Sequence, residues 1–87
     1  MKVRGAVLTE QGVTFAVVSV QPAVLESRSK ADRAMKGAYT LFPGLPIVLM
    51  AKDEAGVAHY YGRQDVARLL TRLDAAHINW QEHTIRA

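Results

Sequence analysis

The most chemically suggestive stretch of the sequence is residues 59–65, which read HYYGRQD. A histidine close to a carboxylate can serve general acid–base catalysis. In a strand, however, alternate side chains point to opposite faces, so His59 and Tyr61 share one face while Tyr60 takes the other. Neither a Ser-His-Asp arrangement nor a catalytic pair of carboxylates accompanies them. The sequence therefore predicts no catalytic residue and no enzyme activity.

The second half of this stretch is typical of a boundary between a strand and a helix. Gly62 suits the helix N-cap or the position beside it. Asp65 in the first turn can accept hydrogen bonds from the free backbone amides there, and its negative charge interacts favourably with the helix dipole. A pocket for a small ligand near His59, Tyr61 and Arg63 remains as a further option, although the sequence favours no particular ligand.

Metal and cofactor sites find little support. His77 and His83 lie six residues apart, a spacing that does not place two ligands on one side of an element, so the fold would have to bring in carboxylates such as Glu82 or Asp53. The dispersed glycines form no phosphate-binding loop. With no cysteine, thiol nucleophiles and Cys-based zinc sites are excluded. We therefore expect no metal and no cofactor.

The basic residues are the stronger candidates for binding. Eleven Lys and Arg against eight Asp and Glu give a formal charge of +3, which permits an anionic partner. If both predicted helices lie on one side of a sheet, their cations form one positive surface for RNA or DNA phosphates, with Tyr39 or Trp80 available to stack on bases. The candidate residues are Arg28, Lys30, Arg33, Lys36, Arg68 and Arg72. The sequence favours the alternative, an ordinary solvated helix face partly neutralised by aspartates.

The elements that position these residues follow from hydrophobic periodicity. Apolar, β-branched runs at 3–8 and 13–20 flank a short polar turn and predict a β-hairpin. Ser29 opens a helix with alanines at helical spacing, and Pro43 ends it.

The second half of the chain repeats this pattern. Residues 47–51 are apolar at every position, and a turn at 53–56 leads to a strand at 57–61. A helix at about 63–74 and a last strand at 78–85 follow. The order ββαββαβ predicts a single α+β domain over residues 1–87.

An apolar run at every position indicates a strand that is covered on both faces. We therefore predict a mixed five-stranded sheet with the strands at 13–20 and 47–51 internal and two helices packed on one face. The second face would then expose an apolar surface, which is unusual on a monomer.

A second copy of the chain is the predicted cover for that face, because symmetric homodimers are the commonest assemblies. The predicted interface comprises Phe15, Val18, Val20, Val48, Met50 and Trp80. Alternatively, residues 21–29 or the last strand fold back over the face. Trp80 lies on a predicted edge strand that can pair with another chain, or, more simply, caps the core beside the second helix.

These features favour a non-catalytic protein-interaction module that forms a homodimer through an apolar sheet face or an edge strand, with another protein as a further partner. The alternative is a small RNA- or DNA-binding protein, which is not favoured. The short apolar run near the N-terminus, interrupted by Thr9 and Glu10, predicts neither a signal peptide nor a membrane span, so we expect a cytoplasmic location.

Overall fold

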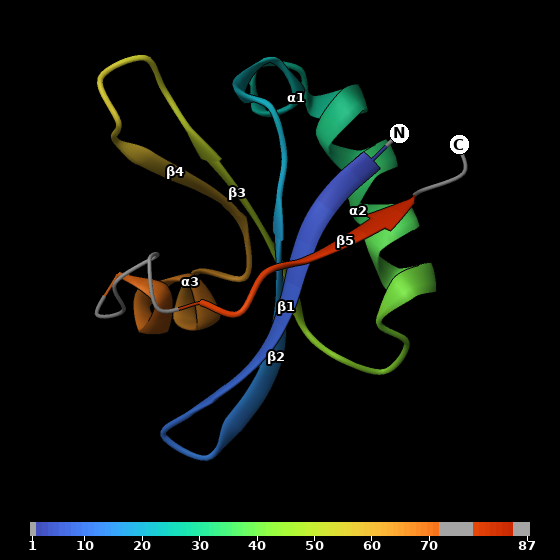
Figure 1. Cartoon of the computed structure of the whole chain (residues 1–87), viewed down its shortest axis with the longest axis vertical. Helices are drawn as coiled ribbons and strands as arrows, with labels where there is room; N and C mark the ends of the chain where they lie inside the picture. Colours follow the sequence, from blue (N-terminus) through green and yellow to red (C-terminus); the bar gives the residue numbers. More distant parts are fainter. Residues whose placement is uncertain (1, 72–77, 85–87) are drawn as a thin grey trace.

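The chain folds as an α+β domain around one sheet (Figure 1). The computed structural model describes residues 2–71 and 78–84. The strands are β1 (Lys2–Glu10), β2 (Val13–Ser19), β3 (Ile47–Lys52), β4 (Ala58–Gly62) and β5 (Gln81–Thr84). The helices are α1 (Pro22–Glu26), α2 (Arg28–Leu41) and α3 (Gln64–Leu70). Apart from the short α1, this is the predicted order of elements.

The sheet has five strands in the order β4-β3-β2-β1-β5. Its β2 and β3 run parallel and are joined through α2, whereas the other neighbouring pairs are antiparallel. The prediction of a mixed sheet with the second and third strands internal is thus confirmed. The hairpin between β1 and β2 turns at Gln11 and Gly12, whose φ values of 51° and 78° suit a tight type I′ turn.

The two longer helices lie on opposite faces of the sheet, so the prediction that both pack on one face is wrong. Figure 1 shows α2 and α3 on either side of the central strands. On the α2 face, alanines of the helix pack on Ala16, Val18, Ile47 and Leu49. The small alanine side chains allow the helix to approach the sheet closely.

The opposite face is covered by α3 together with Ile78 and Trp80, which precede β5. Val66 and Leu70 of α3 pack on a surface that includes Phe15, Val17 and Val48. The physical reason combines the route of the chain with the position of α2: the connection from β4 at one edge to β5 at the other crosses the sheet, and α2 already covers the first face. A sheet that is apolar on both faces is buried most fully when each face receives a helix.

Several element boundaries differ from the predicted ones. The N-cap of α2 is Ser27, whose Oγ accepts a hydrogen bond from the Lys30 amide at 3.4 Å, rather than Ser29. In α3 the described helix ends at Leu70, and residues 72–74 of the predicted helix lie outside the described residues. The last strand begins at Gln81, later than predicted. None of the described helices is long and apolar enough to cross a membrane.

Candidate functional site: the open edge at β4

Strand β4 forms one edge of the sheet, because β3 is its only neighbour among the described strands. The Asp53 amide donates to the Val57 carbonyl at 3.0 Å, which fixes the hydrogen-bonding phase of this antiparallel pair. His59 and Tyr61 therefore direct their amides and carbonyls toward β3. Those of Ala58, Tyr60 and Gly62 point away from β3, toward the open edge.

Asp53 closes the turn that precedes β4. Its Oδ1 accepts hydrogen bonds from the amides of Ala55 and Val57, both at 2.9 Å, and its Oδ2 lies 2.9 Å from His59 Nε2. The hydrogen bond with His59 and then that from the Val57 amide lower the pKa of the Asp53 carboxyl. The carboxylate thus orients both the turn and the exposed imidazole.

Tyr61 joins the strand edge to α2. Its hydroxyl donates a 2.7 Å hydrogen bond to Asp32 Oδ1, across 29 residues of sequence. This hydrogen bond, followed by desolvation, raises the pKa of the Tyr61 phenol. The contact holds the ring over the α2 side of the sheet, where it borders the first core cluster.

A pocket of about 340 Å³ lies between α1 and the β4 edge. Pro22 and Leu25 of α1 form one wall, while Ala51, His59 and Tyr61 contribute from the sheet. The structure thus brings together two of the three residues of the predicted pocket. The third, Arg63, does not line it and instead forms an ion pair with Asp65, with Nη2 2.6 Å from Oδ2.

Two side chains of the opposite edge strand, β5, contact other parts of the chain. Lys2 on β1 and Glu82 on β5 form an exposed ion pair at 3.7 Å, and the His83 ring stands edge-on to Phe42.

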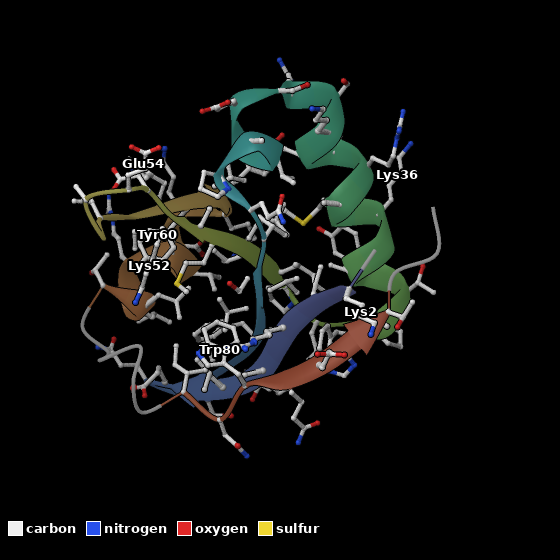
Figure 2. The ribbon with its side chains drawn as sticks, turned by 45° about the horizontal axis from the view of Figure 1, so that its top comes forward. Lys2, Lys36, Lys52, Glu54, Tyr60 and Trp80 are labelled. Carbon is white, nitrogen blue, oxygen red and sulfur yellow. The ribbon has the colours of Figure 1, made fainter. Side chains whose placement is uncertain are left out.

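Trp80, just before β5, is half-buried against the α3 core, which agrees with its interpretation as a core cap. Figure 2 shows Tyr60 and Trp80 on the α3 side of the sheet, away from Lys36 on α2.

The residues predicted for an apolar dimer interface are packed inside the single chain. Phe15 and Val48 are fully buried under α3, Val18 is fully buried under α2, and Met50 is 5% exposed. Val20 is half-buried beside the α2 core. The premise of an uncovered apolar face is therefore wrong, because the chain covers both faces itself.

The predicted basic residues do not form one surface, because α2 and α3 lie on opposite faces of the sheet. Four of them are exposed along α2, namely Arg28, Lys30, Arg33 and Lys36. Arg68 is exposed on α3, at the other side of the molecule, and Arg72 lies outside the described residues. What remains is a basic helix, α2, with Tyr39 half-exposed on it.

Metal ligands do not gather in the described part of the chain, where no group of three potential ligands is found. His59 is engaged by Asp53, His83 lies on the far edge, and His77 falls outside the described residues.

Sequence reasoning missed α1, and with it one wall of the pocket. The signal available was Pro22, which stands at the first position of that helix, where its missing amide costs nothing. A comparison with known proteins gives no match to a family model, a curated protein or a solved structure. Function is therefore inferred from the geometry alone.

Proposed function

We propose that this chain is a cytoplasmic, non-catalytic interaction module that binds an extended strand of polypeptide at an edge of its sheet. The observation that carries this proposal is the β4 edge, where Ala58 and Tyr60 direct backbone donors and acceptors outward beside a pocket. Strand addition uses such an edge for main-chain hydrogen bonds and an adjacent pocket for a side chain.

The covered faces support an edge rather than a face as the binding surface. Since the chain buries both apolar faces of its own sheet, association through the sheet must use backbone groups at its rim. β4 contains no lysine or proline, which are common protections against edge-to-edge pairing.

Two polar groups at this edge already have structural partners, which supports a non-catalytic role. The Asp53 carboxylate holds the turn, and the Tyr61 hydroxyl donates to Asp32. A general base needs a lone pair available to substrate, and a nucleophile needs such a base within reach.

The test is selection from a display library of random heptapeptides on the immobilised protein. Wild-type protein should enrich peptides of alternating polarity, whereas Ala58→Pro should not, because proline removes an outward amide that makes no bond to β3. Ala58→Val keeps that amide and is the matched control. A wild-type protein that enriches no peptide, or an Ala58→Pro variant that enriches the same ones, contradicts the proposal.

A second candidate function is binding of single-stranded nucleic acid by α2. The observation that favours it is the run of exposed cations along this helix, none of which forms an ion pair with a described residue, beside the half-exposed Tyr39. Anisotropy of a labelled oligouridine should rise at low salt and fall as salt is added, and Arg33→Ala with Lys36→Ala should weaken binding. Absence of binding at low salt removes this candidate.

A further inference from the structure

The hydrogen-bonding pattern of β4 is symmetric about Tyr60. Tyr60 directs both its amide and its carbonyl outward, and Ala58 and Gly62 do the same two residues to either side. In an antiparallel pair, directly opposed residues of this kind exchange both of their hydrogen bonds. A two-fold axis between two Tyr60 residues would place Ala58 of each chain opposite the partner's Gly62, so the outward groups of one copy meet those of the other.

From this symmetry we propose that the partner at the edge is a second copy of the same chain, with β4 paired antiparallel to the partner's β4 about Tyr60. The inference rests on the proposed function and names its partner. The two sheets would then join into one continuous sheet across an isologous contact, the kind that a two-fold axis generates.

The side chains in this register are compatible on both faces. On the α1 side, His59 lies opposite the partner's Tyr61, and on the α3 side Tyr60 lies opposite the partner's Tyr60. Aromatic cross-strand pairs of this type stabilise antiparallel strands. No two like charges of β4 are opposed, because the strand reads AHYYG.

The charged residues that flank the strand do not oppose pairing in the same register. Arg63, which follows β4, falls opposite the partner's Val57, at the base of the turn that carries Asp53 and Glu54 in each copy. Arg63 is paired with Asp65 and Asp53 with His59 within each copy, so these charges are satisfied internally and oppose no like charge across the contact.

The other edge fits a second copy less well. β5 has four residues, and its central Glu82 is already paired with Lys2 of the same chain. Antiparallel self-pairing centred on Glu82 would oppose two carboxylates, which is destabilising. The uncharged β4 is thus the edge that suits self-association.

A contact made by one five-residue strand falls below the ~1,200 Å² of a standard interface, so the dimer should be reversible and concentration-dependent. Light scattering over a concentration series should show the mass rising toward twice that of the monomer. High salt should leave most of this association intact, since backbone hydrogen bonds supply it.

A charge-swap experiment tests the register. Tyr60→Lys and Tyr60→Glu should each be monomeric, because each opposes two like charges, while an equimolar mixture of the two should dimerise. Circular dichroism verifies that both variants fold, since Tyr60 also packs beside the α3 core. Ala58→Pro, which changes a small side chain, should weaken the dimer at least about tenfold, and Ala58→Val should not.

The failure of this inference and that of the proposed function are distinguishable. A wild-type chain that stays monomeric throughout the series, yet enriches peptides that Ala58→Pro does not, overturns self-association and leaves the module intact. A dimer unaffected by Ala58→Pro and by both charges at position 60 overturns the β4 contact. A monomer that enriches no peptide overturns both.

Discussion

Leu70→Ala tests whether α3 holds the second face of the sheet closed. Leu70 is 2% exposed and, with Val66, is one of two fully buried residues of this seven-residue helix. It packs over a surface that includes Phe15 and Met50. Replacing Leu70 by alanine leaves a cavity under the helix and removes one of the two buried side chains that attach α3 to the sheet.

Replacing a buried leucine by alanine costs about 2–5 kcal/mol of unfolding free energy, depending on how far the site collapses. A helix this short is not stable by its own propensity and depends on its packing against the sheet. We expect about 3 kcal/mol, a large part of the roughly 5–15 kcal/mol that stabilises a typical domain.

The assay is urea unfolding followed by the fluorescence of Trp80, the only tryptophan, which borders the same core cluster. Arg68→Ala, at an exposed position of the same helix, is the control and should change the stability by less than about 0.5 kcal/mol. If Leu70→Ala were as stable as Arg68→Ala, α3 would not cover the face and the placement of the two helices would have to be revised.

Three further predictions concern two glycines in strands and the turn before β4. Gly62→Ala should lose roughly 1–3 kcal/mol in urea unfolding, because Gly62 has φ 138° and a Cβ there would lie 2.7 Å from a β3 carbonyl oxygen; a neutral result would contradict this backbone conformation and its close approach to β3. Gly5→Val should cost roughly 1–3 kcal/mol by the same assay, since even a Cβ would sit 3.0 Å from the Phe42 ring, and no loss would mean that the ring is not held there. Because the folded state lowers the pKa of Asp53, its contribution to stability is present above the usual aspartate range and is lost as the pH falls through the lowered value. Carboxyl-carbon NMR should show the Asp53 pKa moving back up in His59→Ala, and an unchanged pKa would show that the imidazole is not its main cause.

The sequence predicted the alternation of faces but not the sides taken by the helices. The period-two alternation of a strand places Phe15 and Val17 on one face and Ala16 and Val18 on the other, as observed, although the predicted interface combined Phe15 with Val18. The uniformly apolar run at 47–51 correctly indicated an internal strand. An amphipathic pattern shows that a helix buries one side, but it does not show on which face of the sheet. That choice depends on the route from β4 to β5, which spans the whole sheet and leaves no local signal.

The candidate site was partly predictable for a similar reason. The shared face of His59 and Tyr61 follows from strand periodicity, and both do line one pocket. The contact from Tyr61 to Asp32 joins residues 29 positions apart, so it requires the tertiary fold. The direction of the Tyr60 amide and carbonyl, which point away from β3, depends on the pairing of β4 with β3, and the sequence does not specify that pairing.

Amide hydrogen exchange along β4, measured by NMR over a range of protein concentrations, tests the central claim most directly. The amides of His59 and Tyr61 should exchange slowly at every concentration, because they bond to β3. Those of Ala58 and Tyr60 should exchange rapidly in dilute protein and slow down as the concentration rises and the partner strand covers them. Exchange at Tyr60 that stays rapid at all concentrations would contradict self-association at this edge, and slow exchange in the monomer would contradict an open edge altogether.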